Sequence, residues 1–171
     1  HKISGISDSG LVEIAILDSA TGKIKEGVVN IDGKDIVPLE YDVADMMLRG
    51  RIIKIGNGRR FGLLKADGTE LLPMEYSEIG RYVGGYATIK KGGRLGLINE
   101  QGEVVVEPKY QRIMGFINGI ALVKEAENRY FIMDESFKNI NGEYYQAFAA
   151  ISYADPMTNN YGDNFGIPQD T

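Results

Sequence analysis

Apolar and polar residues alternate in short runs along this chain, and the runs are separated by turns rich in glycine. In residues 86–90, Ala87 and Ile89 alternate with the polar Thr88 and Lys90. A period of two is typical of a β-strand that buries one of its faces. Other runs are rich in Val, Ile and Leu, which favour strands. The pattern therefore predicts a chain built of short β-strands.

The strands recur in a unit of 34–35 residues, which is the spacing of Gly27, Gly62 and Gly96. In every copy a Tyr follows this Gly after 14 residues and a second Gly follows it after 23. A Pro lies between the first Gly and the Tyr. The recurring residues are Pro38, Pro73 and Pro108, then Tyr41, Tyr76 and Tyr110, then Gly50, Gly85 and Gly119. Such self-similarity indicates an array of small repeats.

Each unit is predicted to contain a three-stranded meander, exemplified by residues 86–90, 95–98 and 103–106. The glycines are interpreted as turn residues, because Gly adopts the positive φ that tight hairpin turns need. The Pro is expected to end the third strand, because it has no N–H to donate. The stretch 73–84 is then a connecting loop, with a single helical turn at 76–79.

The predicted fold is all-β, with tandem antiparallel meanders stacked into an elongated or spiralled array; a closed propeller is the alternative. The array covers residues 1–135, and a C-terminal cap and polar tail cover 136–171. Its parts are a half-repeat at 5–26, full repeats at 27–60, 61–94 and 95–129, and a degenerate copy from 130.

The C-terminal cap is predicted from Tyr144, Phe148 and Ile151, which are spaced as on one face of a helix. Residues 142–152 could therefore form a short amphipathic helix, with a β-strand as the alternative. After Pro156 the chain turns polar, and we expect an extended or poorly ordered tail.

Composition excludes several classes of function. The 171 residues carry a net charge of −5 and no cysteine. An acidic chain has no overall attraction to nucleic acids or anionic membranes. Without cysteine there is no disulfide, thiolate nucleophile or cysteine-ligated metal centre. No apolar run approaches the roughly 20 residues that span a bilayer, so membrane insertion is not expected.

The sequence favours no catalytic site. The single histidine is His1, at the end of the chain, which disfavours histidine-based catalysis and metal binding. Paired carboxylates are the remaining enzymatic option. The candidates are Glu40, Asp42 and Asp45, and Glu75 with Glu78. Since Glu40 and Glu75 are repeat-equivalent, solvated loops explain them better. We therefore predict no enzyme, no cofactor and no metal ligand.

A basic surface is the one tentative binding site for a partner. It consists of Arg59 and Arg60 at one hairpin turn, and Lys90, Lys91 and Arg94 at the equivalent turn of the next repeat. Stacked repeats would align these turns into a ladder for an anionic partner. Solubilising charge on hairpin tips is the simpler alternative.

The recurrent Tyr41, Tyr76 and Tyr110 have two interpretations. They could line a sugar-binding groove by stacking, or they could anchor the connecting segment to the core. The second is favoured, because Ile79 and Ile113 follow at matching positions and look buried too. If the three tyrosines are buried, a glycan-binding role loses its support.

The stretches Gly93–Tyr110 and Arg60–Tyr76 resemble the WG, or KWG, β-repeat of bacterial proteins. That unit reads roughly Lys-Trp-Gly-Tyr-Ile-Asp, a Gly turn, a Val/Ile run, Pro-Pro-x-Tyr, a loop and Gly-Leu-Ala-x-Val. The resemblance covers about residues 5–135. This chain departs from it by having no Trp. The Trp position holds Glu26, Phe61, Leu95 and Tyr130, and Phe131 replaces the Gly of the last copy.

Three large side chains at four Trp positions predict a core slot that tolerates different shapes. Glu26 predicts that the first slot is open to solvent or covered differently. The resemblance implies a repeat scaffold, often exported to the periplasm or cell surface, with no common catalytic activity. We therefore expect a non-enzymatic binding or scaffold module for another protein. The alternatives are a cell-envelope glycan-binding module and an enzyme, or a non-catalytic part of a larger one.

Specificity is expected where the period fails rather than at the repeated residues. The period fails at the long turn 18–22, at Glu26, in the copy that begins at Tyr130, and after Pro156.

Overall fold

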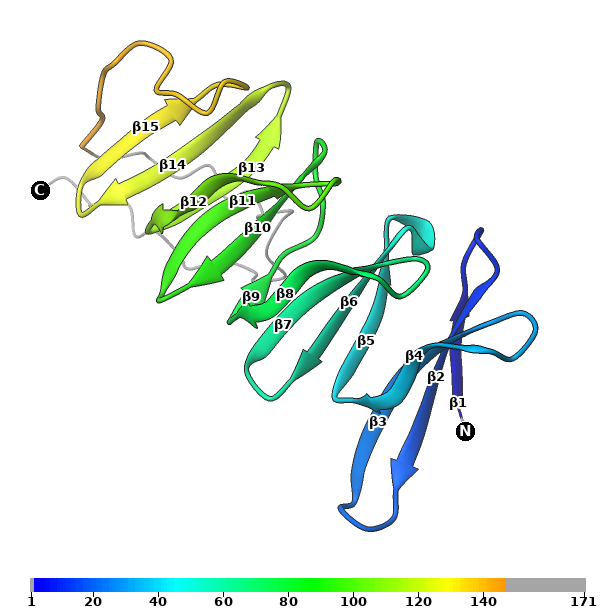
Figure 1. Cartoon of the computed structure of the whole chain (residues 1–171). Coiled ribbons are helices and arrows are strands. Elements are labelled where there is room, and N and C mark those ends of the chain that lie inside the picture. Colours follow the sequence, from blue (N-terminus) through cyan, green and yellow to red (C-terminus); the bar gives the residue numbers. More distant parts are fainter. Residues whose placement is uncertain (1, 147–171) are drawn as a thin grey trace, which may run out of the picture. The chain divides into compact units, whose positions relative to one another are not determined.

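The computed structural model describes residues 2–146, and β-strands make up most of this part of the chain. The strands form antiparallel sheets in which each strand pairs with the next one along the chain. The chain divides into two compact units, His1–Ile79 and Gly80–Thr171. Figure 1 shows the meanders within each unit. The predicted all-β class and the antiparallel meanders are confirmed.

The first unit holds two four-stranded sheets. The first sheet runs in the order β1 (Lys2–Ile6), β2 (Leu11–Asp18), β3 (Lys23–Asn30) and β4 (Asp35–Tyr41). The second sheet runs in the order β5 (Val43–Met47), β6 (Ile52–Asn57), β7 (Arg60–Lys65) and β8 (Glu70–Tyr76). A 3₁₀ turn, Leu48–Gly50, joins β5 to β6, and the short β9 (Glu78–Ile79) ends the unit.

The second unit repeats the arrangement. Its third sheet runs in the order β9, β10 (Tyr86–Lys91), β11 (Arg94–Asn99) and β12 (Val104–Tyr110), so β9 is its first strand. Its fourth sheet contains β13 (Arg112–Ile117), β14 (Ile120–Ala126) and β15 (Arg129–Met133). Every sheet therefore combines strands from two consecutive sequence repeats.

The predicted loop at 73–84 is wrong for residues 73–79, and no helical turn forms at 76–79, whereas residues 80–84 lie between strands β9 and β10 as predicted. Residues up to Tyr76 belong to β8, and β9 follows after a bend at Ser77. Tyr76 and Ile79 are both buried, although they lie three residues apart. The bend interrupts the alternation of buried and exposed residues along the extended chain. Two buried residues therefore lie three positions apart, which is also the spacing of a helical turn. The corresponding segments β5 and β13 add a further strand beside the predicted three.

The prolines do not end the third strand, contrary to the prediction. In the third sheet Val106 pairs with Leu97 and Tyr110 pairs with Leu95, so residues 107–109 all lie opposite Gly96. A bulge of this kind takes Pro108 out of the ladder, where its missing N–H does no harm. The same register shift occurs in the first and second sheets, where β4 and β8 contain Pro38 and Pro73.

The bulge explains the first Gly of each repeat. A Cβ on Gly96 would overlap the carbonyl oxygen of Val106 and lie 2.7 Å from the nitrogen of Pro108. Gly27 and Gly62 meet the bulged strand in the same way, with carbonyl oxygens at 2.7 and 2.8 Å. None of the three has a positive φ. These glycines therefore permit close approach of two backbones, and the interpretation of them as turn residues is corrected.

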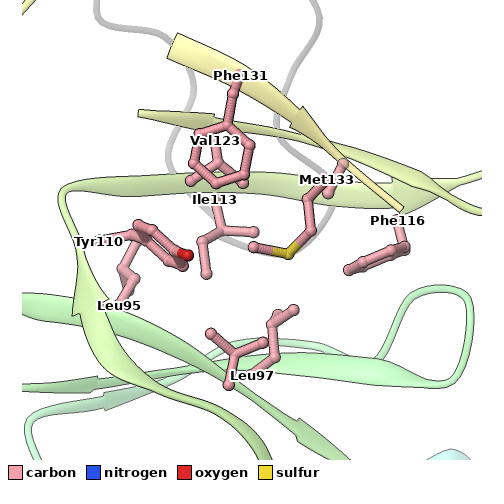
Figure 2. Close-up of a cluster of buried hydrophobic side chains, with 10 residues drawn as sticks. Leu95, Leu97, Tyr110, Ile113, Phe116, Val123, Phe131 and Met133 are labelled. Atoms are coloured by element: carbon pink, nitrogen blue, oxygen red, sulfur yellow. The ribbon is translucent and has the colours of Figure 1, made fainter. Parts of the chain in front are cut away.

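Within each unit the two sheets stack face to face around an apolar core. In the first unit the core residues are Leu11, Val28 and Val37 from the first sheet, and Ala44, Ile53 and Ile55 from the second. In the second unit, side chains of the third sheet meet those of the fourth, as Figure 2 shows for Leu95, Leu97, Tyr110, Phe131 and Met133.

The degenerate copy from Tyr130 extends further than its strand β15. Tyr130 pairs with Tyr145 and Met133 with Asn139, in isolated bridges that repeat the register of the third sheet. The predicted helix at 142–152 is wrong for residues 142–146, which are not helical. Its remaining residues, 147–152, and the tail after Pro156 lie outside the described residues.

This copy keeps the register shift of the bulge but lacks the Gly and the Pro that accompany it in the other copies. Phe131 stands in the Gly position, and Glu143 stands where a Pro would fall. The Phe131 ring packs edge-on against Tyr110 and Tyr144, at centroid distances of 5.6 and 5.8 Å. An aromatic side chain thus occupies the position that is Gly in the other copies.

Candidate interaction surfaces

Residues 2–146 hold no group of three or more His, Asp or Glu side chains placed to bind a metal ion. Among the same residues, no helix has the length and apolar character that crossing a bilayer would require.

The candidate carboxylates do not converge on one point in the first unit. Glu40 and Glu75 are exposed. Asp42 is bound by Lys25, with an N–O distance of 2.8 Å, whereas Asp45 lies 3.5 Å from a different lysine, Lys54. The structure therefore brings these carboxylates to separate cations rather than to each other.

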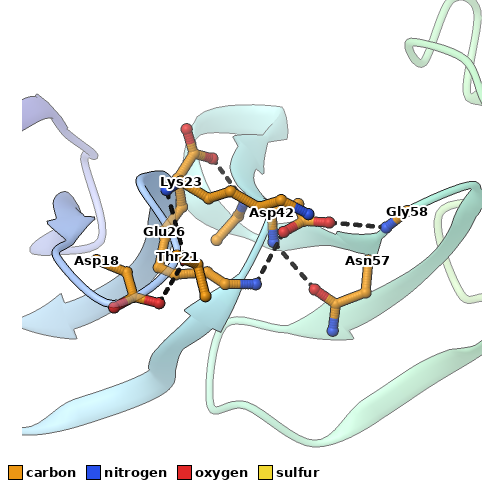
Figure 3. A network of polar contacts seen from close by, with 9 residues as sticks. Asp18, Thr21, Lys23, Glu26, Asp42, Asn57 and Gly58 are labelled. Carbon is orange, nitrogen blue, oxygen red and sulfur yellow. Dashed lines mark hydrogen bonds and ion pairs between the residues drawn. The ribbon is translucent and has the colours of Figure 1, made fainter.

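Asp42 is hydrogen-bonded both to the β6–β7 hairpin turn and to Lys25 of β3 (Figure 3). Its Oδ1 accepts a hydrogen bond from Lys25 Nζ, and its Oδ2 accepts one of 2.8 Å from the Gly58 N–H. Its own N–H donates to Asn57 Oδ1 at 3.0 Å. The hydrogen bond from Lys25, followed by that from Gly58, holds the pKa of Asp42 below its usual value. The network positions the turn that carries Arg59.

Acid is expected to unfold the protein partly through such aspartates. Hydrogen bonds also lower the pKa of Asp18, chiefly from the Thr21 hydroxyl, and of Asp67, chiefly from the Thr69 hydroxyl. A carboxyl group whose pKa is lower in the folded state than in the unfolded state stabilises the fold at every pH above its unfolded-state pKa. This stability is lost as the pH falls through the folded-state pKa. Thermal melts should therefore give a Tm that is level above about pH 5 and falls below about pH 4.

The substitution Asp42→Asn should make that fall of Tm shallower, because it removes one of the linked protons. Asp35→Asn changes an exposed strand residue outside the Asp42 network and serves as the control. An Asp42→Asn melt with the same pH dependence as the unsubstituted chain would contradict this account.

Glu26 fills the Trp position of the first copy by hydrogen bonding. Its Oε2 accepts the Ala44 N–H at 2.8 Å, and Glu13 Oε1 accepts the Met46 N–H at 2.6 Å. Both donors belong to β5, the edge strand of the second sheet. The half-buried Glu26 thus ties two sheets together and protects an edge. In later copies Leu95 and Tyr130 are buried at this position, as expected of a core slot, whereas Phe61 is half-buried.

The predicted basic residues lie at two hairpin turns. Arg59 and Arg60 are exposed together at the β6–β7 turn of the first unit. At the β10–β11 turn of the second unit, Lys91 and Arg94 are exposed and face each other, and Lys90 is half-buried. Each turn is a small basic tip, and a ladder that joins the two turns stays a prediction.

The recurrent tyrosines are core anchors. Tyr76 and Tyr110 are buried, and the half-buried Tyr41 packs against the core of the first unit. Ile79 and Ile113 are buried too, as the sequence predicted. These three rings therefore offer no exposed platform on which a sugar could stack.

One face of the first sheet is apolar and accessible. Leu11 and Val28 point into the core of the first unit, so the residues next to them on β2 and β3 point the other way. Residues that pair across neighbouring strands lie on the same face of the sheet. Ile6 pairs with Val12 and Val12 pairs with Val29, so all three lie on this face. We call the resulting surface the outer face; it consists of Ile3, Ile6, Val12, Ile14, Ile16 and Val29. Ile3 and Ile6 are 66% and 73% exposed, and the others are half-buried.

A second exposed apolar feature is the hairpin between β2 and β3. These strands have eight residues each, against six in β6 and β7. The extra length places Leu17 opposite Ile24, and both side chains are exposed. Asp18 closes the turn by accepting hydrogen bonds from the Ala20 N–H and the Thr21 hydroxyl. The sequence singled out this turn but not the aliphatic pair.

Comparison with known proteins agrees with the repeat pattern. Residues 61–94 and 96–130 match the family model of the WG containing repeat. These two stretches are similar to WG repeats. The predicted resemblance is confirmed over these two consecutive units, although the Trp position of the WG repeats is held here by other large residues. No curated protein matches the chain.

Two solved structures are similar to the chain at low identity. The crystal structure of HIRA(644-1017) is 12% identical with a TM-score of 0.40, and the match covers 81% of this chain and 51% of that one. KlHsv2 with loop 6CD replaced by a Gly-Ser linker is 10% identical with a TM-score of 0.44, covering 81% and 50%. The chain thus spans about half the length of each.

Proposed function

We propose that the protein is a non-enzymatic protein-interaction module, and that its docking site is the outer face of the first sheet. The observation that supports this most directly is the gathering of aliphatic side chains on that face, with Ile3 and Ile6 largely exposed. Contiguous exposed apolar surface marks sites where soluble proteins bind partners.

The chemistry of the outer face suits a protein partner. Its side chains are all Val or Ile, and the adjacent Lys25, which pairs with Ile16, has its amino group engaged by Asp42. Full burial of one such side chain is worth about 1.5–3 kcal/mol. Several of them together can offset the loss of freedom on association. Hydroxyl-rich glycans would find neither aromatic rings nor hydrogen-bonding groups there, so the glycan alternative has no support from this surface.

A photo-crosslinking amino acid placed in the chain in its native cells tests the proposal. Ile6 on the outer face and Ile31 in the β3–β4 turn are exposed to similar extents, 73% and 77%, and form a matched pair. We expect a discrete covalent adduct with a protein from position 6 and none from position 31. The added substitution Ile14→Lys should abolish that adduct. Absence of an adduct at position 6, or equal labelling at both positions, would contradict the proposal.

A further inference from the structure

The outer face has an equivalent in each of the other sheets, and most of the corresponding side chains there are buried. The exception is Leu64 in the second sheet, which is half-buried although its partner Ile53 is buried. Ile14 lies opposite the repeat residue Gly27. The residues that lie opposite the same repeat position in the second, third and fourth sheets are Ile55, Ile89 and Val123. All three are buried, whereas Ile14 is only half-buried.

A second cross-strand pair shows the same difference. Val12 pairs with Val29 on the outer face, and both are half-buried. Its counterpart in the third sheet is the pair Ala87 and Ile98, and in the fourth sheet Ala121 and Met133. These four side chains are buried. The first sheet thus carries a stacking surface that is only partly covered in the described part of the chain.

The fourth sheet presents the complementary surface. Ile132 occupies the same repeat position as Val28, Leu63 and Leu97, which is one residue before the position of Val29, Ile98 and Met133. Val28, Leu63 and Leu97 are fully buried, but Ile132 is only half-buried. Along with its cross-strand neighbours it forms what we call the end face, made of Met114, Ile120, Leu122, Ile132 and Ile140. Ile120 and Ile140 are exposed.

The stacking inside each unit follows one rule. In the first unit, the face of the first sheet that contains Val28 packs on the face of the second that contains Ile55. In the second unit, the face of the third sheet that contains Leu97 packs on the face of the fourth that contains Val123. The end face corresponds to the faces that contain Val28 and Leu97, and the outer face corresponds to the faces that contain Ile55 and Val123. The two partly covered faces are therefore a matched pair.

We infer that the outer face of one molecule binds the end face of a second copy of the same chain, so that the copies associate head to tail. The inference rests on the proposed function, to which it adds the identity of the partner. Each contact would continue the sheet stacking already present within the units. A head-to-tail contact uses different surfaces on the two copies, so it leaves one of each free and allows growth beyond a dimer.

The test is the mass of the purified full chain in solution, measured by sedimentation velocity over a wide range of concentration. The unsubstituted chain should form dimers and then larger species as the concentration rises. Ile14→Lys on the outer face and Ile132→Lys on the end face should each give monomers. Mixed in equal amounts, the two variants should form a dimer and nothing larger, because each contributes the face that the other has lost.

Ile24→Lys is the matched control, since Ile24 is an exposed isoleucine that lies on neither face. It should assemble like the unsubstituted chain. If circular dichroism shows that Ile14→Lys or Ile132→Lys disturbs folding, the exposed Ile3→Lys and Ile140→Lys replace them.

Two results would overturn the inference. One is an unsubstituted chain that stays monomeric at every concentration. The other is a mixture of the two variants that stays monomeric while the unsubstituted chain associates, which would indicate symmetric contact between identical faces. Neither result bears on the photo-crosslinking experiment, in which an adduct from position 6 with a different protein would still support the proposed function.

Discussion

Replacing Gly96 by alanine is expected to destabilise the second unit by about 3 kcal/mol, although only one methyl group is added. The new Cβ would overlap the carbonyl oxygen of Val106 and crowd the nitrogen of Pro108. Both are backbone atoms of the bulge in β12, so no side-chain rotation can relieve the contact. Urea unfolding followed by tyrosine fluorescence measures the effect, since the chain has ten Tyr and no Trp.

Gly5 provides the control for this prediction. It also lies within a strand, but the nearest atom to its added Cβ is a side-chain oxygen at 3.9 Å. Gly5→Ala should therefore be neutral or should stabilise slightly, by up to about 1 kcal/mol, because alanine restricts the unfolded chain. Gly62→Ala should behave like Gly96→Ala. Equal effects of Gly5→Ala and Gly96→Ala would show that the bulge is not what requires glycine.

The period of the repeat was readable from the sequence, but the reason for its Gly and Pro was not. Strand patterns, the all-β class and the burial of Tyr76 and Tyr110 follow from local alternation and recurrence. The bulge is a property of two paired strands, because it depends on three residues of β12 facing Gly96 alone. A local rule therefore assigned the Gly to a turn and ended the strand at Pro108, and both assignments were wrong.

The candidate surfaces were likewise only partly predictable from the sequence. Charged hairpin tips such as Arg59 and Arg60 are visible in sequence as residues of tight turns. The outer face escaped prediction because it depends on which sheets stack on which. A signal was present in residues 11–17, Leu-Val-Glu-Ile-Ala-Ile-Leu, where apolar residues fill both alternating sets. Such a strand is typical of a sheet with two buried faces. Only the structure shows that one of these faces is accessible.

Replacing Phe131 by glycine restores the residue that the repeat has in its other copies, yet it is expected to cost about 4 kcal/mol. Phe131 is buried in the core of the second unit (Figure 2), and its ring contacts the rings of Tyr110 and Tyr144. Removing its ring leaves a cavity, and glycine also weakens a strand interior by about 0.5–1 kcal/mol. Urea unfolding again measures the loss.

Phe131→Leu is the matched control, because it keeps most of the apolar volume and should cost clearly less, about 1–2 kcal/mol. A Phe131→Gly variant as stable as the unsubstituted chain would mean that β15 tolerates glycine at this position without a loss of stability, which would contradict the prediction. The expected loss has the opposite meaning. Glycine is required where the backbone of the bulged strand comes as close as it does at Gly96. The copy with Phe131 and Glu143 keeps the register shift without that Gly and Pro, and it uses the position for an aromatic core residue.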